Sequence, residues 1–545
     1  MALSHWQNIL LRVLFPKGKK FIMKEQSMSN FQNRGFFLLI TLLIAIGGIV
    51  HLTPLVVGGE FMIKSISEDG YLMLTIARNM ALGLGMSTAE GSIPTNGTQP
   101  LMTAIWAAGY WLVNGNKIQG IVWVMVMQFI IATLAAVLLW QGGKRILQQY
   151  TTAGTVAALA AATWYASLLT SMNTTNGLET GLYTLCVIGV AMMFSLTVHT
   201  WSIRRCIGLG VLLGITFWAR NDAVFFIFAV CATHLLLGPF DFNNFKQRLW
   251  QVLVMGTISV VIALPWLINN QLKFGSIMPI SGHSQSLNTS LAGNLPLIPA
   301  TLVQNLLPFA PTPTALQKQI WVIVICTVII LAIGGLLIVL WSRFHTASRR
   351  LVMLVSIYTV GIASYYGLYF GAPQFVDRYL FPSSPFFTLL WAAIVIFVWQ
   401  RLVLTKLRPI MPMFAVAFIG VIVASYVVAY QHLFAHMGIH HGHFKFTNWV
   451  EKNVPEDVWV GAGQSGMLGY FHDRTINLDG KVNPHALKAR KKHELKEYIM
   501  RTDIQYIVDW YYPHLGSSAA MKPPASPNIE LIIREIGLSV WRVHK

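Results

Sequence analysis

The stretch FFLLITLLIAIGGIVHLTP at residues 36–54 decides the class of fold, because it contains no Lys, Arg, Asp or Glu. A helix of this length crosses the roughly 30 Å hydrocarbon core of a bilayer. Further apolar runs follow at 119–140, 153–171, 179–198, 206–219, 222–238, 250–268, 320–341, 350–371, 384–400 and 409–430. The sequence therefore predicts a polytopic α-helical membrane protein with about 11 transmembrane helices.

The composition agrees with this class. Of 545 residues, 55% are hydrophobic and only 11% are charged, and the mean hydropathy is +0.57. A soluble chain has about 25% charged residues. The net charge of +19 would suggest a nucleic acid partner in a soluble protein. In a membrane protein, basic residues more often fix the topology and bind anionic lipid. We expect a membrane partner and no nucleic acid.

The basic residues also predict the orientation. They lie before the first apolar run and in every second loop, at Arg12, Lys17, Lys19, Lys20, Lys24, Arg34, Lys144, Arg145, Arg204, Arg205, Lys246, Arg248, Arg343, Arg349, Arg350, Arg401, Lys406 and Arg408. Cytoplasmic loops are enriched in Lys and Arg. Residues 1–35 are therefore predicted to be cytoplasmic and the first loop, 55–118, external. We expect a multi-pass protein of the bacterial inner membrane.

Two segments outside the spans complete the predicted domains. The apolar stretch 100–113 would break the alternation if it crossed the membrane, so we predict a juxtamembrane helix within the first external loop. The transmembrane domain is predicted at 36–430. In the charged tail, 431–545, the segments 458–463, 474–479, 506–510 and 538–543 are typical of strands, and 485–502 of a helix. The tail is predicted to be a small α/β domain in the periplasm.

Acidic residues are scarce, yet SISEDGY at 65–71 places Glu68 and Asp69 side by side. The other acids within 35–430 are Glu60, Glu90, Glu179, Asp222, Asp241 and Asp377, and all except Asp241 fall at the predicted external face. Charges at membrane depth are costly and tend to be functional. With nearby Lys and Arg side chains, these acids outline a polar site. The cations suit a phosphate and the carboxylates suit a base for a hydroxyl acceptor.

An amphipathic helix is predicted over 71–84, directly after the acidic pair. It is expected to lie in the plane of the membrane interface. Asp69 stands at its start, where a carboxylate commonly caps a helix. From the local sequence alone, a cap, a solvated loop carboxylate and a catalytic group remain open for Asp69.

Several short motifs occur in an order that resembles a known family. They are EDGYLMLTIARNMALGLG (68–85) with PTNGTQPL (94–101), then NGLET (176–180), RND (220–222), FGSIMPISG (274–282), DRYLFPSSP (377–385) and the tail stretch 460–483. This order resembles the polytopic glycosyltransferases of the C superfamily, which use polyprenyl-phosphate sugars. It is most similar to the bacterial arabinofuranosyltransferase and mannosyltransferase-like branch. Two positions differ, with Glu68 where many relatives have Asp and RND where an Arg-Pro-acid triplet is frequent.

The resemblance implies a role for each matching residue. Aligning 75–77 with the lipid A aminoarabinose transferases makes Asp69 the catalytic base, with Glu68 raising its pKa or binding sugar. The implied ligands of the donor phosphate are Arg378, Arg220, Lys273, His283 and Arg78. The implied ligands of the sugar or acceptor are Glu179, Asp222, Asn96, Gln99 and Tyr379. Glu179 is equally well placed to cap the next helix, and the arginines to anchor at the interface.

The implied reaction is a single inverting displacement on the external face. A sugar, either a pentofuranose such as arabinofuranose or mannose, passes from a polyprenyl-phosphate donor to a hydroxyl of a glycan, a lipid or a secreted protein such as a pilin. The alternative is a transporter or lipid-linked sugar flippase. Transporters place their charges near the midplane and between repeats. The acids here fall at one face, which favours the enzyme.

No cofactor is implied, although a divalent cation is left open. His432, His436 and His440 have i, i+4 spacing, which suits a metal. No carboxylate is close to them in sequence, so we interpret this stretch as an interfacial linker and predict no metal site. The cysteines, Cys186, Cys206, Cys231 and Cys326, all lie in apolar runs and predict neither a metal site nor a disulfide framework.

Overall fold

The computed structural model describes residues 30–197, 201–238, 241–402, 411–434, 439–511 and 526–545. Most of the predicted cytoplasmic segment 1–35 lies outside these ranges. So do Lys406, Arg408, His436 and the side chains of His432 and His440.

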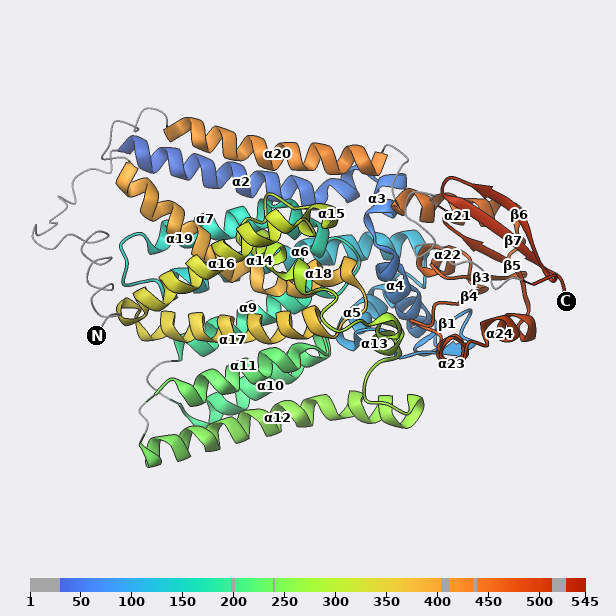
Figure 1. Ribbon diagram of the computed structural model, residues 1–545, viewed down its shortest axis with the longest axis horizontal. Coiled ribbons are helices and arrows are strands. Elements are labelled where there is room, and N and C mark those ends of the chain that lie inside the picture. The colour runs from blue at the N-terminus through green and yellow to red at the C-terminus, as the bar shows by residue number, and fades with distance from the viewer. Residues whose placement is uncertain (1–29, 198–200, 239–240, 403–410, 435–438, 512–525) are drawn as a thin grey trace, which may run out of the picture.

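A bundle of long apolar helices forms most of the molecule (Figure 1). Within the described ranges, seven helices are long and apolar enough to cross a membrane. They are α2 (Asn30–Val57), α6 (Lys117–Ile146), α12 (Phe242–Phe274), α16 (Ile320–Leu340), α17 (Thr346–Leu368), α19 (Ser384–Leu402) and α20 (Met411–Phe434). In α16 and α20 only 11% of the apolar window is buried in the protein, as expected of helices that face lipid. The prediction of a polytopic membrane protein is confirmed.

The other predicted spans are also helices, but they are shorter. The segment 153–171 is divided into α7 (Ala153–Ala166) and α8 (Leu168–Thr174), which meet at 62°. The remaining three are α9 (Thr180–Leu196), α10 (Ile203–Ala219) and α11 (Ala223–Leu236). Counting α7 and α8 as one span gives up to eight candidates in the part of the chain described, against about 11 predicted. The three short helices pack among their neighbours, so their length is not fixed by lipid alone.

One end of the bundle, here called the sheet end, lies next to the C-terminal β-sheet (Figure 1). The first loop is built there from α3 (Gly59–Ser65), α4 (Glu68–Ala81), β1 (Ser87–Thr88), β2 (Ile93–Pro94) and α5 (Pro100–Leu112). Of the later segments, α13 (Ile280–Gln285) lies beside them, whereas α14 (Ile298–Leu306), α15 (Thr314–Gln317) and α18 (Val376–Leu380) lie further into the bundle (Figure 1). With 13 residues, α5 is too short to span a bilayer, in agreement with the prediction.

The helix after the acidic pair is not the surface helix that its sequence predicts. Almost all of α4 is buried, including its polar residues Thr75 and Asn79. The C-terminal domain covers part of α4 through α22 (Gly466–Phe471) and pairs Asp473 with Arg78, whereas Asn79 bonds to Ser87 of the first loop. The prediction is wrong because a helix between two protein layers can have the same amphipathic sequence pattern as a helix between lipid and water.

The C-terminal domain has a five-stranded sheet, and the helix α21 (Ile439–Asn453) packs against two of its strands, β5 and β7. The strands are β3 (Trp459–Ala462), β4 (Thr475–Asn477), β5 (Ile504–Asp509), β6 (Ile529–Glu535) and β7 (Leu538–Val543). Their order is β4-β3-β5-β7-β6, with β4, β3 and β5 parallel and the rest antiparallel. The α/β domain and its four predicted strands are confirmed. The strand β6 was not predicted, and it joins β7 through a tight turn at Gly537, whose φ is +81°.

The predicted helix at 485–502 is two helices. They are α23 (Pro484–Lys491) and α24 (Leu495–Arg501), separated at His493, whose φ is +60°. This left-handed residue ends α23 and turns the chain, so that α24 packs beside β5.

The loops divide by charge as predicted. Basic connections such as α6–α7 and α16–α17 lie at the end of the bundle away from the sheet, whereas α4, which begins at Glu68, lies at the sheet end (Figure 1). Glu179 stands at the start of α9 and acts on Arg378 together with Asp69, and Asp222 pairs with Arg220 just before α11. The grouping of the acids at one end is therefore present in the fold. Which side of the membrane each end faces stays a prediction.

Candidate functional site

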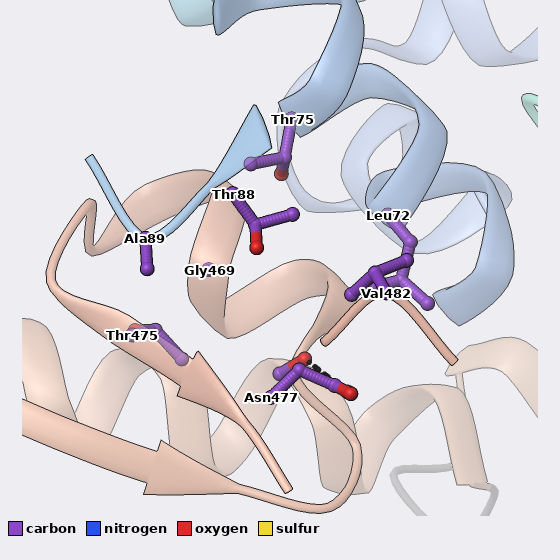
Figure 2. Close-up of a pocket in the computed structure, with 9 residues that line it drawn as sticks. Leu72, Thr75, Thr88, Ala89, Gly469, Thr475, Asn477 and Val482 are labelled. Atoms are coloured by element: carbon purple, nitrogen blue, oxygen red, sulfur yellow. Dashed lines mark hydrogen bonds between the residues drawn. The ribbon is translucent and has the colours of Figure 1, made fainter. Parts of the chain in front are cut away.

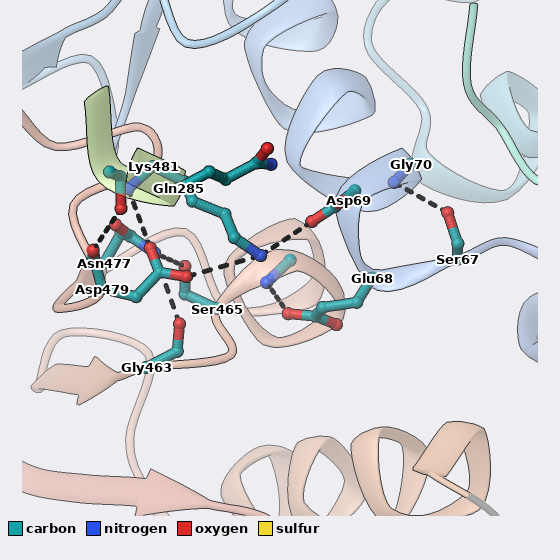
Figure 3. Close-up of polar contacts among 12 residues, drawn as sticks. Ser67, Glu68, Asp69, Gly70, Gln285, Gly463, Ser465, Asn477, Asp479 and Lys481 are labelled. Carbon is teal, nitrogen blue, oxygen red and sulfur yellow. Dashed lines mark hydrogen bonds and ion pairs between the residues drawn. The ribbon is translucent and has the colours of Figure 1, made fainter. Parts of the chain in front are cut away.

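The acidic pair forms the first turn of α4. Ser67 caps this helix, because its hydroxyl accepts a hydrogen bond from the Gly70 amide at 3.1 Å. The same hydroxyl donates to the Asn176 carbonyl at 3.0 Å, which fixes the turn against the loop before α9. Asp69 is therefore not the cap, and its carboxylate is available for other partners (Figure 3).

Asp69 lies between two cations that come from distant parts of the chain. Arg378 in α18 donates to one carboxylate oxygen at 3.2 Å, and Lys481, in the loop after β4, donates to the other at 3.0 Å. All three side chains are at most 17% exposed. Burial alone would raise the pKa of Asp69, but Lys481 and Arg378 outweigh it and lower the pKa to about 2. The group is thus an ionised carboxylate at neutral pH.

The carboxylate of Glu68 contacts the backbone of the C-terminal domain. Its carboxylate accepts hydrogen bonds from the backbone amides of Gly466 and Met467, at the start of α22, the latter at 3.1 Å. His443 lies 3.7 Å from it. Burial raises the pKa of Glu68 to about 7, against the opposing effect of these amides and of Lys481. Glu68 therefore binds the C-terminal domain to the first loop, and both of its oxygens already have partners.

Arg220 and Asp222, in the turn between α10 and α11, form a buried bidentate pair at 2.9 and 2.5 Å. The hydroxyl of Tyr366 donates to the same carboxylate at 2.8 Å. The guanidinium of Arg220 lies 4.6 Å from the ring centre of Tyr379, while Arg378 lies 5.2 Å from that ring. The two arginines thus lie near the same tyrosine, but Asp222 neutralises Arg220, and one nitrogen of Arg220 (Nη1) has no hydrogen-bond partner.

Glu179 is a buried carboxylate at the start of α9, with 5% of the residue exposed. It occupies the cap position but makes no capping hydrogen bond, so the capping interpretation is not supported. Its charge acts on both Arg220 and Arg378. Glu179 and the unpartnered nitrogen of Arg220 together offer an acceptor and a donor for a polar ligand.

Asn96 and Gln99, the two predicted ligands within PTNGTQPL, mainly shape the backbone around Asp69, Arg378 and Arg220. Asn96 is fully buried and accepts a hydrogen bond from the Ile280 amide at 3.1 Å, at the start of α13. Gln99 accepts one from the Asn221 amide at 3.3 Å. The side-chain nitrogen of Asn96 has no partner. Both residues connect the first loop to motifs far along the chain.

Three predicted phosphate ligands are not in this cluster. Lys273, at the end of α12, is exposed. His283 bonds to Ser276 at 3.0 Å, and its pKa is lowered by burial and by Lys491. Arg78 donates to the Gly115 carbonyl at 2.8 Å and pairs with Asp473 at 3.0 Å. Arg78 therefore helps to fix the C-terminal domain on the first loop, which is a structural role.

No role was predicted for Lys481, which the structure places beside Asp69 in the candidate site. It pairs with Asp69 and, at 3.6 Å, with Asp479 (Figure 3). Lys481 lies within the tail motif 460–483, which the sequence predicts to belong to a separate domain. An available signal was NLDGKVN itself, an acid and a lysine around a glycine.

A small cavity lies beside the cluster, between α4, β1 and the C-terminal domain (Figure 2). Its wall includes Leu72, Thr75, Thr88, Asn477 and Val482, and its volume is about 10 Å³, room for about one water molecule. Ligand pockets usually enclose about 300–1,000 Å³. This space is a packing gap between the first loop and the C-terminal domain, and it is too small for a lipid-linked sugar.

Within the described ranges, no group of three or more His, Cys, Asp or Glu side chains is arranged to hold a metal ion. His436 and the side chains of His432 and His440 lie outside the described part of the chain, so the interpretation of this stretch stays a prediction.

Known structures share this fold. The crystal structure of ArnT from Cupriavidus metallidurans bound to undecaprenyl phosphate matches with a TM-score of 0.54 and 11% identity, over 92% of this chain and 97% of that chain. Its apo structure gives the same values. An oligosaccharyltransferase of Archaeoglobus fulgidus matches with a TM-score of 0.47 and 10% identity, over 86% of this chain and 69% of that chain. The chain has the polytopic fold of ArnT, as the sequence resemblance implied.

Sequence comparisons add one match. Residues 430–537 match a family model described as a domain of unknown function, DUF8728. No curated protein matches the chain. The matched region is the C-terminal domain that supplies Lys481 and the amides around Glu68.

Proposed function

We propose that this chain is a membrane glycosyltransferase that moves a sugar from a polyprenyl-phosphate donor to a hydroxyl acceptor. The observation behind the proposal is the position of Asp69, a carboxylate between two cations, at the sheet end of a bundle with the fold of ArnT. The ArnT crystal structure contains undecaprenyl phosphate. A site with both a base and phosphate ligands suits such a donor.

The reaction is a single displacement with inversion at the anomeric carbon. The acceptor oxygen forms a bond to that carbon, while its proton passes to the Asp69 carboxylate. The bond from the anomeric carbon to the phosphate oxygen breaks, and its electron pair stays on the phosphate. Arg378 and Lys481 offset the charge that develops there. A phosphate is already a good leaving group, so no general acid is needed.

The donor sugar would lie toward Glu179 and Arg220, the buried groups with unused hydrogen-bonding capacity. Carboxylates accept hydrogen bonds from sugar hydroxyls. A pentofuranose such as arabinofuranose, or mannose, presents hydroxyls of this kind. The acceptor is a glycan, a lipid or a secreted protein such as a pilin, approached from the periplasmic side of the bacterial inner membrane.

The test begins with the lipid that copurifies with the full chain, identified by mass spectrometry. The polyprenyl-phosphate sugar found there is then used as donor in reconstituted membranes. Asp69→Asn should reduce turnover by about 10²–10⁴-fold, the usual contribution of a general base. Asp503→Asn removes an exposed acid of the C-terminal domain and serves as the matched control. Full turnover by Asp69→Asn would overturn the assignment of the base, and uptake of the sugar without transfer would indicate a transporter.

A further inference from the structure

We propose that the C-terminal domain is part of the active site: it delivers Lys481, which leaves Asp69 to bind the donor phosphate and thereby frees the base. This inference rests on the proposed function. It also assigns a task to the region 430–537, which matches a family of unknown function.

The domain is docked closely enough to position one side chain. A Cβ added to Gly97 would overlap the backbone oxygen of Lys481, and one added to Gly466 would overlap that of Glu68. Asp473 pairs with Arg78 and with Lys117, at 3.0 and 3.2 Å. The backbone on either side of the interface therefore has little freedom to shift.

Lys481 also pairs with a second carboxylate, and this pair can persist when the lysine leaves Asp69. Asp479 lies 3.6 Å from its ammonium group. Asp479 is itself fixed, because the Lys481 amide donates to its carboxylate at 2.8 Å and the Arg490 side chain donates to its carbonyl. A lysine side chain has several rotatable bonds and three donors, so it can change one partner while it keeps the other.

The charges explain why this exchange matters. A carboxylate between two cations is ionised but weakly basic, because both cations stabilise its charged form. A donor phosphate near Arg378 and Lys481 competes with Asp69 for the same cations. Once Arg378 and Lys481 pair with the phosphate, Asp69 loses part of that stabilisation and accepts a proton more readily.

The charged groups that face Asp69 come from several elements. Glu68 is its neighbour on α4, and Arg378 faces it from α18. Lys481 and Asp479 face it from the loop after β4, and the charge of Glu179 reaches Arg378 from α9. A variant of Lys481 changes only one of these groups, so its effect on Asp69 can be separated from the effects of the others.

Binding of undecaprenyl phosphate, without sugar, to the full chain in lipid nanodiscs gives the first test. Lys481→Met should weaken binding at least tenfold, whereas Asp69→Asn should tighten it several-fold because the competing carboxylate is neutralised. In the double variant, the effects of the two substitutions on the free energy of binding should not be additive. Lys445→Met removes an ion pair elsewhere in the domain and is the matched control. Additive effects, or unchanged binding by Lys481→Met, would overturn the proposal.

The pH dependence of donor turnover gives the second test. In Lys481→Met, the acid limb of kcat/KM should move to higher pH, because the free enzyme has lost a cation beside Asp69. Lys481→Arg keeps the charge and should restore the wild-type limb. A change in rate without a shift of the limb would mean that Lys481 only supports the structure. If the wild type binds the lipid but transfers no sugar, the proposed function fails while the binding result on Lys481 stands.

Discussion

Glu68 and Asp69 are adjacent in sequence, but their carboxylates bind different partners. Asp69 pairs with the side chains of Arg378 and Lys481, whereas Glu68 accepts hydrogen bonds from the Gly466 and Met467 amides. The separation follows from the helix, since successive residues of a first turn point about 100° apart. One residue therefore faces the candidate site, and the other attaches the domain that completes it.

Glu68 should make stability depend on pH. Its pKa is raised from 4.5 to about 7, so its contribution is fully present below pH 4.5 and is lost as the pH rises through 7. The melting temperature of the wild type should therefore fall between pH 5 and 8. Glu68→Gln should flatten this slope, while Glu497→Gln, an exposed acid of α24, should keep it. An equal slope in Glu68→Gln would assign the effect to another group, first of all to His443 beside it.

Arg378 and Arg220 should respond differently to substitution by Gln. Arg378→Gln removes a cation that faces Asp69 and should raise the donor KM at least tenfold. Arg220→Gln leaves Asp222 buried without its cation, and breaking such a pair costs about 3–5 kcal/mol of stability. Thermal melting and donor kinetics on both variants separate the two roles. An unchanged melting temperature with a raised KM in Arg220→Gln would instead make it a donor ligand.

Gly466→Ala should displace the C-terminal domain, because the added methyl group overlaps the backbone oxygen of Glu68. We expect lower turnover and faster proteolysis of the domain. Gly208→Ala is the control, since a Cβ at this helical glycine meets no atom within 4 Å. That variant should be as active as the wild type. Normal turnover by Gly466→Ala would show that the interface tolerates movement.

Glu179→Gln should weaken recognition of the sugar and not of the lipid phosphate. Loss of hydrogen bonds to a charged group costs roughly 10- to 100-fold in affinity. The KM for the sugar-bearing donor should rise by that factor, with binding of undecaprenyl phosphate unchanged. An equal loss for both ligands would place Glu179 in the phosphate subsite.

The membrane part of the fold was predictable because each span is local. An apolar run of about 20 residues needs no distant partner to be identified, and each of the predicted runs is helical in its described part, although 153–171 is divided into α7 and α8. Lengths were less predictable, because α10 and α11 are separated by the buried pair Arg220–Asp222, and burial within protein relaxes the length that lipid would demand.

The candidate site was predictable only in part. Asp69 and Arg378 are in motifs recognised by their order, and they do meet in the structure. Lys481 was not predicted, because no periodicity connects a lysine of a polar tail with a loop 412 residues earlier. Arg78 and Lys273 carry the right charge for a phosphate but face other surroundings, which only the packing of α4 and α12 reveals.

The pairing of Asp69 with Lys481 has a consequence for biosynthesis. A ribosome adds about 5–20 residues per second, so Lys481 is made about 20–80 s after Asp69. During that interval the helices insert while the acidic pair has neither Lys481 nor the amides of α22. The nascent chain therefore exists for a time with its helices inserted and its candidate site incomplete, and the site is complete only when the C-terminal domain folds onto the first loop.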